Sequence, residues 1–158
     1  MASRLKKLSA EDFEALYRIV VSEEPFGETV SFEHLKMRMK GRDGWTLWNG
    51  EELIGALTLF DLQPLLNMSI HVMIDRNMHR RWINREILRQ MFCYAFGDLE
   101  LRRLSSHWIP GLTDDAAILL ASLGFRIEGT VRKGFRDPYG NFWDVVIFGM
   151  LAEECKWL

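Results

Sequence analysis

With 158 residues the chain is long enough to bury one ordinary hydrophobic core, and we expect a single domain over residues 1–158. Its composition, 48% hydrophobic and 27% charged, is typical of a globular protein and excludes a disordered chain. A formal net charge of -2 provides no overall positive field, so neither nucleic acid nor an acidic membrane is an expected partner.

The first half of the chain predicts two helices and four strands. Ser9 and Ser31 are candidate N-caps, and the loop Glu23–Val30, rich in carboxylates and containing Pro and Gly, separates the two helices. Asn49-Gly50 is a strong hairpin signal. The expected elements are strand Arg4–Leu8, helix Ala10–Val21, helix Phe32–Lys40, and strands Trp45–Trp48, Glu52–Leu62 and Asn67–Ile74.

The second half predicts two further helices and three strands. Gly97 is expected to end the first helix, Thr113 to cap the second, and Gly124 to occupy its C′ position. The expected elements are helix Arg81–Phe96, strand Leu101–Ile109, a helix from the Thr113 cap to Ser122, and strands Phe125–Phe135 and Asn141–Leu151. This order predicts a mixed α/β fold with a central, mostly antiparallel sheet and helices on both faces.

The two cysteines and the N-terminal residues indicate the compartment. Cys93 and Cys155 are far apart and show neither a CxxC nor a Cys/His ligand spacing, so we expect free thiols, a reducing compartment and no bound metal. The opening MASRLKKLSAEDF is too polar for a signal peptide, and no apolar run approaches the length of a membrane span. The resulting prediction is a cytoplasmic protein.

Four short motifs follow one another in the last third of the chain: Leu123-Gly124-Phe125, Glu128-Gly129, Arg132 and Trp143-Asp144-Val145. Their order and spacing, together with the order of the elements, resemble the GCN5-related N-acetyltransferase (GNAT) superfamily. Within it, the motifs are most similar to the RimJ/RimL-like branch, which acetylates the N-termini of ribosomal proteins. The resemblance covers nearly the whole chain and implies an acetyl-CoA-dependent N-acetyltransferase acting on a primary amine, in this branch a protein N-terminus.

The resemblance also implies where acetyl-CoA binds: pantetheine along strand Asn67–Ile74, and pyrophosphate at the N-terminus of the next helix, where unpaired N–H groups attract anions. The two glycine positions of the family's phosphate loop fall here on Arg80 and Trp82. Glycine admits phosphate close to the main chain, whereas arginine binds it through the guanidinium group. The expected cofactor-binding residues are Met73, Ile74, Arg76, Arg80, Arg81, Trp82, Asn84 and Arg85.

An Arg-Trp pair in this loop is similar to phage-encoded members of the superfamily. The stripe formed by Arg81, Arg85 and Arg89 has an alternative interpretation, a solvated helix face.

Two histidines are the candidate catalytic residues. His71 and His107 fall on the fourth and fifth strands, which the resemblance implies splay apart to admit acetyl-CoA, and a neutral imidazole can accept a proton near pH 7. The alternative is that each histidine is packed within the sheet. In the RimJ/RimL-like branch, a hydroxyl side chain protonates the leaving thiolate. The corresponding residue here is Ala116, so this hydroxyl is absent.

The loop between the first two expected helices contains three carboxylates, Glu23, Glu24 and Glu28. In this superfamily the loop commonly contacts the acceptor, and carboxylates there would favour a cationic amine. The alternative is a solvated acidic loop.

Two functions therefore remain open. The first is the N-acetyltransferase. The second is a catalytically inactive GNAT-fold binding or structural module, for example in a phage particle, which the missing loop glycines and Ala116 favour. A homo-oligomer is compatible with both.

Overall fold

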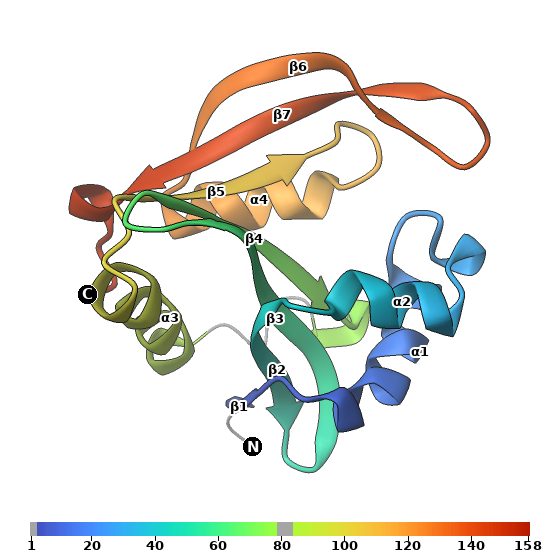
Figure 1. Ribbon diagram of the computed structural model, residues 1–158, viewed down its shortest axis with the longest axis horizontal. Coiled ribbons are helices and arrows are strands. Elements are labelled where there is room, and N and C mark those ends of the chain that lie inside the picture. Colours follow the sequence, from blue (N-terminus) through green and yellow to red (C-terminus); the bar gives the residue numbers. More distant parts are fainter. Residues whose placement is uncertain (1–2, 79–83) are drawn as a thin grey trace. The chain divides into compact units, whose positions relative to one another are not determined.

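The computed structural model describes residues 3–78 and 84–158, and its elements follow the predicted order (Figure 1). The prediction of a mixed α/β fold is confirmed. The strands are β1 Ser3–Lys7, β2 Asp43–Asn49, β3 Glu52–Gln63, β4 Asn67–Ile74, β5 Arg103–Trp108, β6 Arg126–Arg136 and β7 Phe142–Leu151. The α-helices are α1 Phe13–Glu23, α2 Phe32–Met39, α3 Arg85–Phe92 and α4 Asp114–Leu123.

The strands form a seven-stranded sheet in the order β1-β2-β3-β4-β5-β7-β6. The β4–β5 pair is parallel, as expected for a β-α-β crossover, whereas β1–β2, β2–β3, β5–β7 and β6–β7 are antiparallel. The prediction of a mostly antiparallel mixed sheet is therefore confirmed. The chain divides into two compact units: an N-terminal unit, Met1–Phe60 with His71–Leu88, and a C-terminal unit, Asp61–Ile70 with Arg89–Leu158.

The core of the N-terminal unit lies where α1 and α2 pack on strand residues. Apolar side chains recur at i and i+4 in both helices, which places them on one face. The buried cluster consists of Leu16, Val20, Leu35, Met39, Ala56 and Met73. Ser31 caps α2 as predicted, because its side chain accepts a hydrogen bond from the His34 amide at 3.1 Å.

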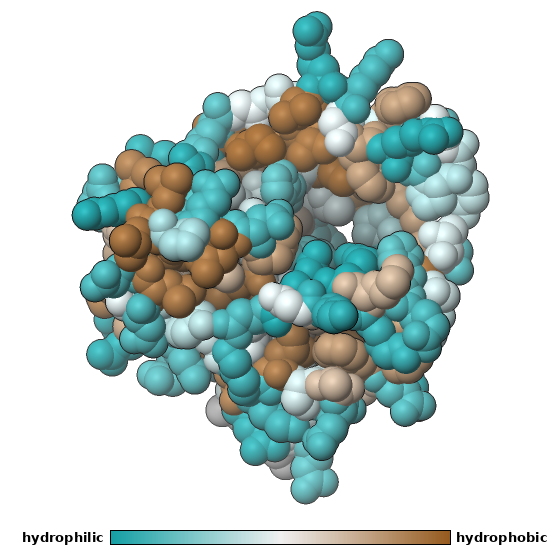
Figure 2. All heavy atoms as spheres, viewed as in Figure 1, coloured by the Kyte–Doolittle hydropathy of each residue, from teal (hydrophilic) through white to brown (hydrophobic). Residues whose placement is uncertain are grey.

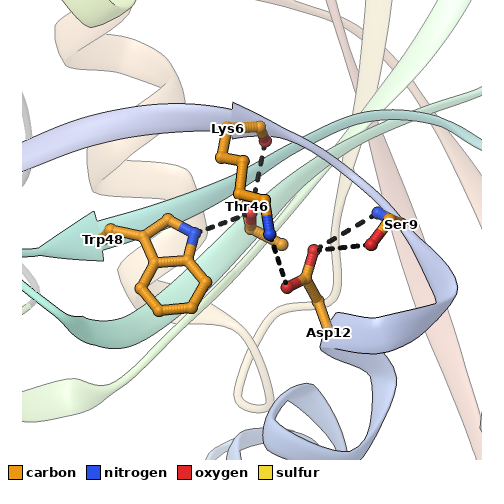
Figure 3. Close-up of polar contacts among 5 residues, drawn as sticks. All are labelled: Lys6, Ser9, Asp12, Thr46 and Trp48. Carbon is orange, nitrogen blue, oxygen red and sulfur yellow. Dashed lines mark hydrogen bonds and ion pairs between the residues drawn. The ribbon is translucent and has the colours of Figure 1, made fainter.

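A polar network fixes the start of α1 (Figure 3). Asp12 is only 5% exposed, and its carboxylate accepts from the Ser9 amide at 3.3 Å and lies 3.5 Å from the Lys6 ammonium group. On β2, the Thr46 hydroxyl donates to the Lys6 carbonyl at 3.2 Å and accepts from the Trp48 indole at 2.8 Å. These buried polar groups are thus paired, as a stable interior requires.

The C-terminal unit has its own core between α4 and the strands β5 and β7. Gly124 ends α4 in the left-handed conformation, as predicted, and the Trp157 indole donates to the Leu123 carbonyl at 2.9 Å. Cys93 and Cys155 are free thiols, and burial raises the pKa of Cys155. The buried apolar residues of α4, β5 and β7 are Leu104, Leu120, Leu123, Val145, Val146, Phe148 and Met150, and Phe125, just after α4, is also buried.

One polar side chain organises the hairpin loop between β6 and β7. The Asp137 carboxylate is 4% exposed and accepts hydrogen bonds from the amides of Tyr139 and Asn141, the Asn141 side chain and the Trp143 indole, at 2.9 to 3.0 Å. Burial by itself would raise the pKa of Asp137, but these hydrogen bonds outweigh it and lower the pKa.

Three local predictions need correction. The α-helix begins at Phe13 rather than Ala10, because Ala10–Asp12 forms a 3₁₀ turn in which Asp12 bonds back to Ser9. Gly97 does not end the helix that contains α3. A π-helical segment, Cys93–Asp98, extends it past Gly97, and the Leu99 amide donates to the Tyr94 carbonyl at 2.9 Å.

The third correction concerns Thr113, which precedes α4 but makes no side-chain cap. Its hydroxyl instead accepts from the Ile109 amide at 2.8 Å, because the preceding turn competes for it. Asp114 bonds back to the same turn, accepting from the Gly111 amide at 2.9 Å and the Trp108 indole at 3.0 Å. These two hydrogen bonds lower the pKa of Asp114.

The surface is mixed in polarity. In the view of Figure 2, hydrophilic side chains cover most of what is visible and interrupt the hydrophobic patches. Leu62, Leu65 and Leu66, at the β3–β4 turn, are among the exposed large apolar residues. Within residues 3–78 and 84–158, no helix combines the length and the apolar character needed to cross a membrane.

Candidate functional site

The loop after α1 turns a carboxylate toward the core side of the N-terminal unit. Pro25 restricts the residue before it to extended conformations, and Glu24 has φ -82° and ψ 145° accordingly. The chain then folds back so closely that a Cβ on Gly27 would lie 1.9 Å from the Val20 carbonyl oxygen. Pro25 and Gly27 together therefore fix the position of Glu24.

Alternation along β4 brings His71 to the same region. His71 lies two residues before Met73, so the two side chains share one face of the strand. Met73 is 2% exposed and belongs to the buried cluster formed with α1 and α2. His71 is consequently directed toward the side of the strand on which α1 ends and α2 packs.

Three side chains meet there, and we refer to them as the Glu24–His71–Arg38 cluster. Nε2 of His71 lies 3.3 Å from Oε1 of Glu24, and Nη2 of Arg38 lies 3.6 Å from Oε2 of Glu24. The side chains of Glu24, Arg38 and His71 are 17%, 29% and 34% exposed. Each oxygen of one half-buried carboxylate thus faces a different nitrogen-bearing side chain.

This arrangement suits proton transfer. A histidine whose one ring nitrogen faces a carboxylate is held in a single orientation, and its other ring nitrogen can act as a base. Oε1 of Glu24 is buried and accepts no hydrogen bond within the described part of the chain, and Nε2 of His71 faces it at 3.3 Å. The sequence prediction of a solvated acidic loop does not hold for Glu24.

The second candidate base, His107, has a different setting. It lies on β5 in the C-terminal unit, opposite Ile147 of β7, and its side chain is exposed. Within residues 3–78 and 84–158, no carboxylate contacts His107. Of the two predicted histidines, His71 is therefore the one that the fold brings together with an acidic partner.

The predicted phosphate-binding residues are only partly described. Arg80, Arg81 and Trp82 lie outside the described residues, and Arg76 contributes its backbone to a 3₁₀ turn, Arg76–Met78. Asn84 caps α3, since its Oδ1 accepts from the Ile87 amide at 2.9 Å.

The other predicted cofactor-binding residues precede and follow this segment in the sequence. Arg85 opens α3 and is exposed, as is Arg89 one turn later, which fits the solvated face weighed as an alternative. Met73 and Ile74 are 2% and 8% exposed, so their side chains belong to the interior and their backbone is what a ligand could use.

The parallel pairing of β4 stops early. Its ladder with β5 consists of Asn67, Met68 and Ser69 opposite Arg103, Leu104 and Ser105. At the next residue a side chain replaces the ladder, because the Ser106 hydroxyl donates to the Ile70 carbonyl at 3.0 Å. A strand edge without a full ladder can pair with an extended ligand that carries amide groups.

The family-like motifs of the C-terminal unit have structural tasks. Glu128 pairs with Arg103 across the sheet, and the Asp144 carboxylate accepts from the Lys133 amide at 2.7 Å within an irregular part of the β6–β7 ladder. Sequence reasoning named Glu24 and His71 separately but missed Arg38 and the meeting of the three. The Pro25 and Gly27 spacing was the available signal that Glu24 turns inward.

No protein-family model and no curated protein sequence matches the chain. Solved structures do match it. A T. thermophilus protein described as an acetyltransferase superimposes with a TM-score of 0.76 at 22% identity, over 98% of this chain and 88% of that one. The chain has the GNAT acetyltransferase fold.

A second GNAT-fold structure agrees. The spermidine N-acetyltransferase of Vibrio cholerae in complex with CoA and spermine has a TM-score of 0.76 at 18% identity, with 96% of each chain covered. The fold that the sequence resemblance implied is therefore the fold observed.

Proposed function

We propose that this chain is an acetyl-CoA-dependent N-acetyltransferase that acts on a primary amine. The observation that carries the proposal is the Glu24–His71–Arg38 cluster, a carboxylate-backed histidine on β4 of a GNAT fold. Acetyl transfer to an amine requires a base that works near neutral pH, and histidine meets that requirement. His71 is the proposed base, and His107 is the weaker candidate because its side chain is exposed without a carboxylate contact in the described chain.

Acetyl-CoA is the proposed co-substrate. The backbone of β4 beyond its short ladder with β5, including Met73 and Ile74, is proposed to pair with the two amides of pantetheine. The N-terminal end of α3 and the arginines before it are proposed to bind the pyrophosphate, as the sequence resemblance implies. The proposed residues there are Arg76, Arg80, Arg81, Trp82, Asn84 and Arg85.

In the proposed reaction, the amine nitrogen forms a bond to the thioester carbonyl carbon of acetyl-CoA, and the carbon–sulfur bond breaks. His71 accepts the proton that leaves the nitrogen. The imidazolium returns this proton to the departing sulfur, so the products are the N-acetylated amine and CoA with a free thiol. This route needs no hydroxyl at Ala116.

For the acceptor we propose a protein N-terminus, on the RimJ/RimL-like motifs between Leu123 and Val145. A phage origin rests on the Arg80 to Trp82 stretch alone. A single domain over residues 1–158, a cytoplasmic location and a possible homo-oligomer remain predictions from the sequence.

Calorimetric titration with acetyl-CoA tests the proposal directly. We expect saturable binding that Arg80→Glu weakens, followed by acetyl transfer to a peptide N-terminus measured by CoA thiol release. Spermidine serves as the comparison acceptor, because a protein with the same fold binds spermine. Absence of binding at millimolar acetyl-CoA contradicts the proposal.

The alternative is a GNAT-fold binding or structural module without catalysis. The observation in its favour is the replacement of both loop glycines by Arg80 and Trp82. This alternative expects a folded, oligomeric protein that binds no acetyl-CoA, which sedimentation and the same titration distinguish from an enzyme.

A further inference from the structure

We propose that Glu24 is a positioning residue that sets the tautomer and orientation of His71, and that Arg38 holds Glu24 for this task; the catalytic part of the inference rests on the proposed N-acetyltransferase function. The geometry that points to it is a single carboxylate whose two oxygens face two different side chains, 3.3 Å from His71 and 3.6 Å from Arg38.

The backbone of the loop fixes the position of Glu24 independently of His71. Pro25 keeps Glu24 extended, and the close approach of Gly27 to the Val20 carbonyl anchors the loop to the end of α1. The Glu24 amide also bonds to the Val20 carbonyl at 3.2 Å, so the residue remains attached to the last turn of the helix. A carboxylate on such a support can orient a neighbouring ring.

Arg38 provides the second restraint. It lies on α2 three residues after Leu35, which is fully buried, so the same helix face that packs the core also presents the guanidinium group to Glu24. With Oε2 facing Arg38, the remaining oxygen, Oε1, is left for His71. Without Arg38 the carboxylate could rotate and its second oxygen would compete for the ring.

The chemical consequence lies in the tautomer of His71. The negative charge of the carboxylate, 3.3 Å from Nε2, favours a proton on that nitrogen, which leaves the lone pair of the neutral ring on Nδ1. Removing the carboxylate withdraws this preference for a proton on Nε2. The positioning role thus predicts one tautomer in the native protein and a mixture when Glu24 is replaced.

The experiment uses the full chain with ¹⁵N-labelled histidine. The four imidazoles are observed by NMR, and His71→Gln assigns the His71 signals. Glu24→Met keeps an unbranched side chain but removes the acceptor, whereas Glu24→Gln removes only the charge. Glu14→Met, on the exposed side of α1, is the matched control, and Arg38→Lys is compared with Arg38→Met.

We expect the Nε2–H tautomer to dominate in the native protein, Arg38→Lys and Glu14→Met, and a mixture in Glu24→Met and Arg38→Met. Glu24→Gln is expected in between. In acetyl transfer, kcat of Glu24→Met is expected to fall about tenfold or more with KM within about twofold, since the base is misplaced rather than the substrate lost.

The outcomes separate the two proposals. An unchanged tautomer in Glu24→Met overturns the positioning role whether or not the native protein transfers acetyl groups. A changed tautomer with unchanged kcat overturns its catalytic part and leaves the N-acetyltransferase intact. If the native protein transfers nothing, the proposed function fails, and the tautomer alone decides whether Glu24 positions His71. If the far-ultraviolet spectrum of Glu24→Met shows that this variant does not fold, the tautomer of Glu24→Gln is compared with that of the native protein instead.

Discussion

Asp137 and Asp144 of the C-terminal unit accept hydrogen bonds from nearby backbone amides, whereas the cluster in the N-terminal unit brings one carboxylate to two nitrogen-bearing side chains. Asp137 accepts from two backbone amides and two side chains, and Asp144 accepts from the Lys133 amide. Glu24 instead faces His71 and Arg38. The C-terminal unit contains the motifs by which the chain resembles a family, while the N-terminal unit contains the proposed base, His71.

The recognisable motifs and the proposed reactive site thus belong to different parts of one chain. Among the motif residues, Gly124 ends α4, and Glu128 pairs with Arg103 across the sheet. Replacing such residues should change the stability of the protein and leave acetyl transfer intact. Replacing residues of the Glu24–His71–Arg38 cluster should lower acetyl transfer and leave the stability nearly unchanged. Substitutions in the two units test that separation.

The largest loss of stability is expected from a substitution in the core beneath the Glu24–His71–Arg38 cluster. Met73→Ala removes a side chain that is 2% exposed and is expected to lower the free energy of unfolding by about 2–5 kcal/mol, because a cavity remains. Met37→Ala, at a position 72% exposed on α2, is the matched control and should change it by less than about 0.5 kcal/mol. Urea unfolding measures both. Equal effects would contradict the assignment of Met73 to the core.

Gly27→Ala should break the support of Glu24. The added Cβ would lie 1.9 Å from the Val20 carbonyl oxygen, so the loop must move, at an expected cost of about 1–3 kcal/mol. The His71 tautomer should change in the same variant. Gly97→Ala has open space around its Cβ and should leave both properties unchanged; a tolerated Gly27→Ala would show that the loop is not fixed in this way.

Asp137 should make the stability of the C-terminal unit depend on acid pH. Its pKa is lowered in the folded protein, so its contribution is present above the ordinary carboxyl pKa and is lost as the pH falls through the lowered value. Asp137→Asn should therefore lower stability at neutral pH and flatten the loss of stability below about pH 4. Chemical denaturation at a series of pH values measures this. An unaltered acid limb would show that the hydrogen bonds to Asp137 do not favour its charged form.

The Arg103–Glu128 pair should matter least. Its side chains are 29% and 35% exposed, and such pairs contribute about 0–1 kcal/mol because water screens them. Glu128→Gln should lower stability by no more than this and leave acetyl transfer unchanged. A loss of activity without a loss of stability would place part of the chemistry in the C-terminal unit and end the separation drawn above.

Much of the fold was predictable from local signals. Alternation gave β4 its bounds, Asn49-Gly50 gave the β2–β3 hairpin, and Ser31 gave the start of α2. The errors arose at the ends of elements. The turn before α4 engages the Thr113 hydroxyl in place of the predicted cap, and a π-helical segment extends the helix past Gly97.

The candidate site was predictable only in part. His71 could be proposed from its strand and Glu24 from its loop, but their contact depends on packing between segments 47 residues apart in the sequence. Arg38 carries no sequence signal beyond its spacing from Leu35. Residues Arg80 to Trp82, on which the phosphate prediction rests, lie outside the described chain.

The most direct test of the account is acetyl transfer by His71→Gln compared with the native chain at saturating acetyl-CoA. We expect the native chain to acetylate a primary amine and His71→Gln to lower kcat by a factor on the order of 10² to 10⁴, with calorimetric binding of acetyl-CoA retained. Equal turnover in the two proteins, or no transfer by the native chain to either acceptor, would contradict the account.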